Sequence, residues 1–365
     1  MKIKYWDFKR EYIRNKKNYL KEIDKTLLSK SLILGDQVKS FEKNISKYIG
    51  FRYGVGVNSG TDALIISLMS IGIKRGDQII TTSNTAIPTI SAIVSVGAKP
   101  IYVDVKDEDY LINENLIERN ISKKTKAIII VHLYGQSPNL KKIIRICKKY
   151  NIKIIEDCAQ SFGAKYFSKK LGSFGDVSAF SFYPTKVLGT FGDGGMILTN
   201  NKKIFENCKM LRFYGIKKDY FSKKHGINSR LDEIHASILN FKIKQVDKKI
   251  KLRRSIANFY NKNINNKKII LPKENENTFH VYYNYVIRSK KRNKLKKHLS
   301  KYGVETKVVY PHPVHRMKPY ANFAKTNTNL KVTEKLSKEI LSLPIYPELK
   351  KLELKKIIKT INSFK

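Results

Sequence analysis

The feature that most constrains the fold is a regular alternation of short apolar runs with helical stretches between residues 53 and 199. Runs such as QIITT (78–82), AIIIVH (127–132) and IKIIED (152–157) are rich in β-branched residues and almost continuously apolar. Strands of that kind are buried on both faces, which is typical of a mostly parallel sheet covered by helices on each side. The sequence therefore predicts the α/β fold class.

Two segments before this alternation have apolar residues at helical spacing, namely residues 11–30 and 37–49. The second segment ends at Gly50, a residue that commonly terminates helices. We expect both segments to form amphipathic entry helices.

The pattern changes after about residue 200. Longer basic helices follow, including a helical region at about 230–263, and then an aromatic alternating strand at 280–288 and a helix at 290–302. We therefore expect a large domain over residues 1–240 and a small C-terminal α+β domain over residues 241–365.

The chain is strongly basic, with 73 Lys and Arg residues against 30 Asp and Glu and a formal net charge of +43. Charge of this size is often found in proteins that bind nucleic acid or membrane surfaces. Here the lysines are spread through the predicted helices, with no basic tail and no single stripe that would follow a phosphate backbone. We therefore expect solvated helix faces and no nucleic-acid partner, and we expect the charge to attract small anionic substrates.

The cysteines and the apolar runs indicate in which cellular compartment the protein is expected. Cys147, Cys158 and Cys208 are odd in number and lack CxxC spacing, so neither a disulfide framework nor a zinc ribbon is expected. The N-terminal residues lack the apolar core of a signal peptide, and the longest apolar runs have the length of strands. These features favour a cytoplasmic protein with no membrane insertion.

Ligands of open parallel sheets bind where the carboxyl ends of the strands meet, and several predicted strand ends here carry polar groups. In NSGTDALIIS (58–67) a strand passes through Ser59, Gly60 and Thr61 into a helix. Amides at a helix start together with a hydroxyl make a site for an anion, most naturally a phosphate. An ordinary helix N-cap explains the same motif, so this motif alone does not identify a site.

Asp157 ends a β-branched strand in IIEDCAQSFGA, and a carboxylate at that depth needs a cation or hydrogen-bond donors nearby. One interpretation is a structural acid that caps the next helix. The other is a partner for a protonated pyridine nitrogen, because a carboxylate there keeps the ring an electron sink.

A third strand end leads into SFYPTKVLGTFGDGG (181–195), where the glycine-rich continuation is incompatible with a helix and places Lys186 on a loop. A lysine that is desolvated at such a position is a competent amine for Schiff-base formation. A single lysine in so basic a chain is usually a surface residue. The combination with the helix start and Asp157 favours a covalent cofactor site.

Four motifs in the order NSGTDAL, EDCAQSFGA, SFYPTKVLGTFGDGG and GINSRLDEIHASIL closely resemble the sugar-nucleotide aminotransferases of the DegT/DnrJ/StrS type, over nearly the whole chain. The resemblance implies an aspartate-aminotransferase-like fold (fold type I), with a mostly parallel mixed sheet in the large domain, and a homodimer whose active site is shared across the interface. It also implies transamination, because the dehydratase-like members have a histidine where this chain has Lys186.

The implied cofactor is pyridoxal 5′-phosphate, which becomes pyridoxamine phosphate between the half-reactions. By resemblance, Lys186 would bind it covalently and move protons, Asp157 would pair with the pyridine nitrogen, and Gln160 would lie near the phenolic oxygen. The phosphate would be bound by Gly60, Thr61, Ser181 and, from the neighbouring subunit, Asn228. Many relatives place an aromatic ring over the cofactor where this chain has Ala86, so we expect the stacking contact to come from Asn84, Thr85 or another part of the chain.

Three segments, SNTAIPT, VHLYGQS and SFYPTK, look most like enzymes that aminate C3 of a dTDP-3-keto-6-deoxyhexose with L-glutamate. The product would be a dTDP-3-amino-3,6-dideoxyhexose of glucose or galactose configuration, used for surface glycans. Amination at C4 of a UDP- or dTDP-linked keto sugar is the alternative. The resemblance implies substrate contacts from Tyr183, Arg212, Tyr214, Lys217, Arg230, Tyr310 and His315.

Two other functions compete with this interpretation. An amino-acid aminotransferase would need an arginine for the substrate carboxylate, for which Arg288 and Arg316 are the candidates. A basic protein that binds nucleic acid or anionic lipid is the second. His312 and His315 have the i, i+3 spacing of metal ligands but no converging third ligand, so we expect no metal.

Overall fold

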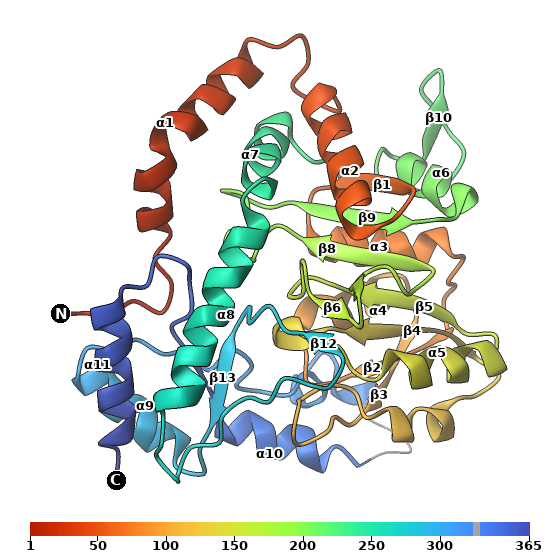
Figure 1. The fold of residues 1–365 in the computed structure, drawn as a ribbon. Helices are drawn as coiled ribbons and strands as arrows, with labels where there is room; N and C mark the ends of the chain where they lie inside the picture. The colour runs from red at the N-terminus through yellow and green to blue at the C-terminus, as the bar shows by residue number, and fades with distance from the viewer. Residues whose placement is uncertain (324–328) are drawn as a thin grey trace.

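The computed structural model describes residues 1–323 and 329–365. At its centre is a seven-stranded sheet with the order β1-β9-β8-β5-β4-β2-β3 (Figure 1). Strand β9 runs antiparallel to both of its neighbours, and every other pairing in the sheet is parallel. The predicted α/β class with a mostly parallel sheet is confirmed.

The strands coincide with the apolar runs of the sequence. They are β1 (Tyr53–Val57), β2 (Gln78–Thr82), β3 (Lys99–Val103), β4 (Thr125–Val131), β5 (Lys153–Asp157), β8 (Val177–Ser181) and β9 (Gly195–Thr199). The helices between and after them are α3 (Gly60–Ser70), α4 (Ile87–Ser95), α5 (Leu140–Lys149) and α6 (Lys202–Leu211).

The continuous apolar run of β4 reflects burial on both faces of the sheet. Successive side chains of a strand point to opposite faces. Ile128 and Ile130 belong to one hydrophobic core, and Ile129 between them belongs to a second core on the other side. All three side chains are at most 1% exposed, so no polar residue alternates with them.

The two predicted entry helices are present as α1 (Phe8–Leu27) and α2 (Asp36–Ile49). Helix α2 ends at Gly50, whose φ of 97° lies in the left-handed region that glycine adopts without strain. Helix α1 stands away from the sheet and approaches α7 (Glu233–Ile243), as Figure 1 shows.

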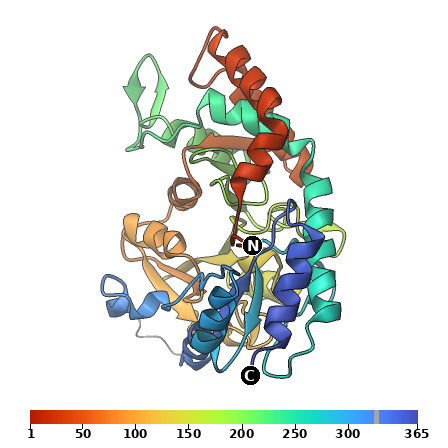
Figure 2. The ribbon, with the colours of Figure 1, turned by 90° about the vertical axis from the view of Figure 1, so that its left-hand side faces the viewer.

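The C-terminal elements build a third core. They include α8 (Val246–Asn263), β13 (Tyr285–Arg288), α9 (Arg292–Lys301), β14 (Ile340–Leu343) and α11 (Lys351–Asn362). Helix α10 (Lys331–Glu339) lies between α9 and β14 in the sequence, and its Leu336 belongs to the core that contains Ile129. The amide of Ile3 donates to the carbonyl of Gly303 over 2.8 Å, so the N-terminus lies beside these elements (Figure 2). The domain division at residue 240 stays a prediction.

The predicted strand at 280–288 is wrong in its first half. Tyr282 has a φ of 47°, outside the range of extended backbone. The amides of Val281 and Tyr283 donate instead to the carbonyls of Gly135 and Tyr134. A strand conformation begins only at Tyr285, because the preceding residues form hydrogen bonds with the loop after β4.

The remaining elements are short. They are β6 (Lys165–Tyr166), β7 (Lys169–Lys170), β10 (Ile216–Lys218), β11 (Phe221–Ser222), β12 (Thr278–Phe279), and the 3-10 helices Glu114–Leu116, Glu118–Asn120, Leu133–Gly135, Val314–Arg316 and Ala321–Phe323. The β10–β11 hairpin projects from the sheet beside α6 (Figure 1). In the described ranges, no helix combines the length and apolar character needed to cross a membrane.

Candidate active site

A cavity of about 190 Å³ lies where the carboxyl ends of β5 and β8 meet the starts of α3 and α4. Residues far apart in the sequence come together here because parallel strands present their carboxyl ends at one edge of the sheet. Eight of the residues predicted from the sequence line it, namely Gly60, Thr61, Thr85, Asp157, Gln160, Ser181, Tyr183 and Lys186.

The start of α3 and the end of β8 are in close contact. Ser59 caps the helix, and its Oγ accepts a hydrogen bond from the Asp62 amide over 3.0 Å, so the N-cap interpretation is correct. A Cβ atom on Gly60 would lie 2.6 Å from the Ser181 Cβ, so only glycine allows this approach. The Ser181 hydroxyl therefore lies next to amides at a helix start, a combination that suits a phosphate.

Replacing Gly60 with alanine is expected to destabilise the fold by about 1–3 kcal/mol, the usual cost of forcing an extra methyl group into a packed site. The contact is with a Cβ next to the backbone, which has little freedom to move away. Urea unfolding of the Gly60→Ala variant measures the effect. The double variant Gly60→Ala, Ser181→Gly removes the opposing Cβ and should recover most of the lost free energy of unfolding. An unchanged free energy of unfolding in Gly60→Ala would contradict the close approach.

Asp157 lies at the end of β5, is 6% exposed and lines the cavity. Its two carboxylate oxygens accept hydrogen bonds from the Thr89 hydroxyl over 2.8 Å and from the Ala159 amide over 3.1 Å. Burial raises the pKa of this carboxyl although both donors oppose the shift. Both donors are neutral, and a protonated ring nitrogen in the cavity would supply a positive charge in contact with the carboxylate.

Lys186 lies in the loop after β8, as predicted, and is partly buried. Its ammonium group is 4.8 Å from the centre of the Tyr283 ring. Burial opposes ionisation of the Tyr283 phenol, yet the Lys186 ammonium, the Thr185 hydroxyl and Arg253 together lower its pKa. Sequence reasoning missed Tyr283, and the only available signal was the aromatic density of residues 282–285.

Both the oxygen and the nitrogen of the Gln160 side-chain amide form hydrogen bonds. Its oxygen accepts a hydrogen bond from the Tyr134 amide over 2.9 Å, and its nitrogen donates to the Tyr310 hydroxyl over 2.5 Å. Gln160 reaches the cavity, while Tyr310 does not line it and contacts Gln160. Tyr310 therefore orients Gln160, and its predicted contact with the substrate stays a prediction.

Ala86 leaves no aromatic ring at its position in the cavity wall. Thr85 beside it lines the cavity, and its hydroxyl is 3.0 Å from that of Thr89, which in turn bonds Asp157. Asn84 is buried, and its side-chain nitrogen donates to the Tyr110 carbonyl over 3.1 Å. Thr85 therefore lines the cavity and Asn84 does not, and the contacts of both residues with the cofactor stay predictions.

Two predicted substrate residues are held by other parts of the protein. Arg212 is 6% exposed and is bonded to the Glu42 carboxylate and the Gly56 carbonyl. His315 is 5% exposed, with one ring nitrogen 2.7 Å from the Ser83 hydroxyl and the other 3.1 Å from Glu334. These bonds hold both side chains within this chain, although Arg212 Nε has no hydrogen-bond partner among the described residues. The contacts of Arg212 and His315 with a substrate stay predictions.

The predicted residues of the β10–β11 region lie outside the cavity of this chain. Tyr214 is 44% exposed, and Asn228 and Lys217 are exposed too. The guanidinium of Arg230 lies 5.3 Å from the centre of the Phe213 ring. Their contacts with a cofactor or substrate stay predictions.

His132, Glu156 and Cys158 form a buried group near the cavity, with ligand-type atoms within 4.8 Å of one another. Both carboxylate oxygens of Glu156 already have hydrogen-bond partners. Glu156 lies 2.9 Å from His132 Nε2 and accepts hydrogen bonds from the backbone amides of Gly172, Phe174 and Gly175. This arrangement fixes the loop between β5 and β8, and it uses the lone pairs that a metal would need.

Comparison with known proteins agrees with this geometry. Residues 14–362 match the DegT/DnrJ/EryC1/StrS aminotransferase family. The chain is 40% identical to a dTDP-3-amino-3,4,6-trideoxy-alpha-D-glucose transaminase of Micromonospora megalomicea subsp. nigra, with 94% of each chain covered. It is 39% identical to a dTDP-3-amino-3,6-dideoxy-alpha-D-galactopyranose transaminase of Aneurinibacillus thermoaerophilus, with 99% of each covered. Its fold matches S. venezuelae DesV with a TM-score of 0.96 at 33% identity, covering 99% of this chain and 98% of DesV.

The fold and the cavity thus define an aminotransferase. The chain belongs to the DegT/DnrJ/EryC1/StrS aminotransferase family and is dependent on pyridoxal phosphate. The residues present fit that cofactor, because a helix start with the Ser181 hydroxyl suits its phosphate, Asp157 suits its ring nitrogen and Lys186 suits its aldehyde.

Proposed function

We propose that the protein transfers the amino group of L-glutamate to C3 of a dTDP-3-keto-6-deoxyhexose. The product is a dTDP-3-amino-3,6-dideoxyhexose of glucose or galactose configuration. The observation that supports transamination most strongly is the cavity, because it brings Lys186, Asp157 and the start of α3 together. The choice of C3 and of a dTDP-sugar is supported by two relatives that are named for such sugars and match almost end to end.

Bound pyridoxal phosphate supplies an electron sink for the carbon that gains or loses a proton. Lys186 would hold the cofactor, and its free amine would move the proton at the reacting carbon as base and acid. Asp157, at the end of β5, would keep the ring nitrogen protonated. Tyr183 is 51% exposed and lines the cavity, which supports a contact with the sugar.

We further propose a cytoplasmic homodimer in which the neighbouring subunit supplies Asn228 to the cofactor phosphate. Exposure of Asn228 in this chain supports that assignment. Apolar side chains along α1 and the turn after it support it as well, since Leu27, Leu28 and Leu32 are 50–81% exposed. An exposed apolar surface of this kind marks a protein contact.

Amination at C4, or of a sugar on another nucleotide, is the second candidate. It is favoured by relatives at 37% and 35% identity that are named for a UDP-linked sugar and for GDP-perosamine. An amino-acid aminotransferase is less well supported, because its candidate arginines are already paired. Arg288 bonds Asp107 and Glu339, and Arg316 bonds Glu334.

Product analysis decides between these sugars. The purified protein with pyridoxal phosphate and L-glutamate is incubated with dTDP-3-keto- and dTDP-4-keto-6-deoxyhexoses, and the position of the new amine is determined by NMR. We expect amination at C3. Amination at C4 only, or of UDP-sugars only, would refute the proposed substrate.

A further inference from the structure

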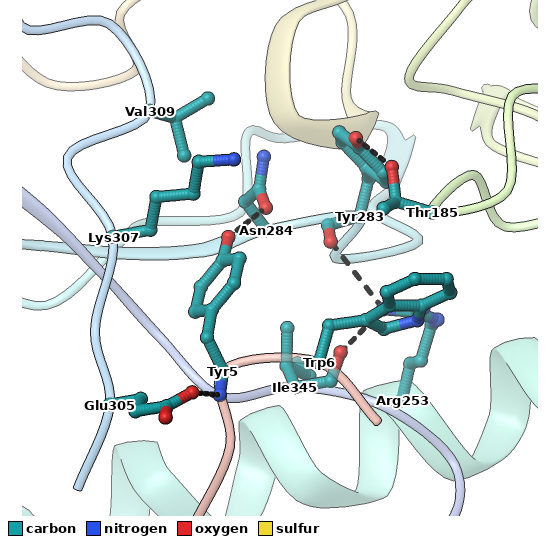
Figure 3. A pocket seen from close by; sticks show the side chains of 10 residues that line it. All are labelled: Tyr5, Trp6, Thr185, Arg253, Tyr283, Asn284, Glu305, Lys307, Val309 and Ile345. Carbon is teal, nitrogen blue, oxygen red and sulfur yellow. Dashed lines mark hydrogen bonds between the residues drawn. The ribbon is translucent and has the colours of Figure 1, made fainter. Parts of the chain in front are cut away.

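A second cavity, of about 230 Å³, lies between the N-terminal residues and the C-terminal elements (Figure 3). Thr185 and Tyr283 contribute to its wall. Thr185 directly precedes Lys186, and Tyr283 lies under the Lys186 ammonium group. This cavity therefore adjoins the cofactor cavity across the turn that carries Lys186.

Asn284 is the first sign that the cavity receives a ligand. The side chain is 6% exposed, and its oxygen accepts a hydrogen bond from the Tyr5 hydroxyl over 2.6 Å. Its amide nitrogen is buried and has no hydrogen-bond partner among the described residues. Since buried donors are almost always paired, an unpaired donor in a cavity wall indicates a missing acceptor.

The charges of the wall indicate that this acceptor is an anion. Lys307 is exposed, and no described residue pairs with its ammonium group, which points toward Asn284 in Figure 3. Arg253 is 4% exposed, and the hydrogen bonds of its guanidinium go to backbone carbonyls, the shortest being 2.7 Å to Ile345. The acid of the wall, Glu305, is already engaged by the Tyr5 amide and by Lys2. The wall thus presents an excess of positive charge and an unpaired donor.

The size of the cavity limits the anion. Pockets that enclose a whole drug-sized ligand are about 300–1,000 Å³, so a cavity below that range suits a small anion or one charged group of a larger molecule. A transaminase has a second substrate that is both small and anionic, namely the amino donor. The two arginines considered from the sequence for a carboxylate, Arg288 and Arg316, are occupied by acids of the protein.

We propose that this second cavity binds a carboxylate of the amino donor, a small dicarboxylic amino acid, through Asn284 and Lys307 with Arg253 behind them. The proposal rests on the proposed transaminase function. It assigns a carboxylate of the donor to the cavity beside Thr185 and Tyr283, next to Lys186.

Binding of glutarate tests the proposal, because glutarate has the two carboxylates of the donor but no amine and cannot react. The Asn284→Asp variant keeps the acceptor for Tyr5 and replaces the unpaired donor by an oxygen. Calorimetry on the cofactor-loaded enzyme is expected to show that this variant binds glutarate at least about tenfold more weakly than the unmodified enzyme. Lys307→Met should weaken binding by a similar factor. Lys262→Met removes an equal charge from an exposed site on α8 and should leave binding unchanged.

Glutarate affinity that is unchanged in both Asn284→Asp and Lys307→Met would overturn the proposal. The proposal would also be overturned if these variants bound inorganic pyrophosphate more weakly but glutarate equally well. The cavity would then bind the diphosphate of the sugar nucleotide. The sugar-product assay is separate from this measurement. An enzyme that aminates C3 but fails the glutarate test refutes only the donor site, and one that passes it without aminating C3 refutes only the proposed sugar.

Discussion

Replacing Lys186 with alanine is expected to remove the visible absorbance of protein-bound pyridoxal phosphate and to lower turnover by about 10⁴-fold, the upper range for loss of a positioned acid–base group. The same amine makes the covalent bond and moves the proton, so no other group of the cavity replaces it. Absorbance spectra of the purified variant and steady-state kinetics with glutamate measure the two effects.

Lys170 is a matched control for this prediction. It is partly buried, and its ammonium group lies 3.9 Å from the centre of the Tyr48 ring, an environment similar to that of Lys186 over Tyr283. It does not line the cofactor cavity. Lys170→Ala should keep both the absorbance and the turnover, and a Lys186→Ala enzyme that behaved like it would refute the assignment.

Replacing Asp157 with asparagine is expected to lower turnover by about 10²–10³-fold, the size found when one preorganised charge-stabilising group is lost. Asparagine keeps the shape of the side chain but removes the negative charge that favours a protonated ring nitrogen. Comparing kcat at saturating cofactor separates this effect from weaker cofactor binding. Asp36→Asn, at an almost fully exposed carboxylate, is the control, and full turnover in Asp157→Asn would contradict the proposed pairing.

Much of the fold follows from local sequence. The run AIIIV around Ile129 is continuous because both faces of β4 are buried, and that pattern is visible without a structure. The expectation failed at residues 280–284, where alternating aromatic residues also suit a strand. Their amides bond the loop around Gly135, which is more than a hundred residues away, so no local pattern predicts the break.

The residues of the candidate site also fall into those that local sequence predicts and those that it does not. Lys186, Asp157 and Gly60 were predictable because each lies at a strand end or helix start that the sequence marks. The bonds of Arg212 to Glu42 and of His315 to Glu334 were not predictable, because these pairs are set by packing and not by spacing.

The second cavity was not predicted at all. Asn284 gives no signal in a sequence where asparagine is abundant, and its importance lies in a nitrogen without a partner. Only the fold brings it together with Tyr5 and Lys307.

The central claim, that Lys186 carries the cofactor, is tested most directly by borohydride reduction of the loaded enzyme followed by peptide mass mapping. Reduction makes the bond between cofactor and lysine permanent, so the modified residue is read from the peptide. The account predicts a single phosphopyridoxyl group on Lys186, in the peptide that contains SFYPTK. Modification of another lysine with Lys186 unmodified would contradict it.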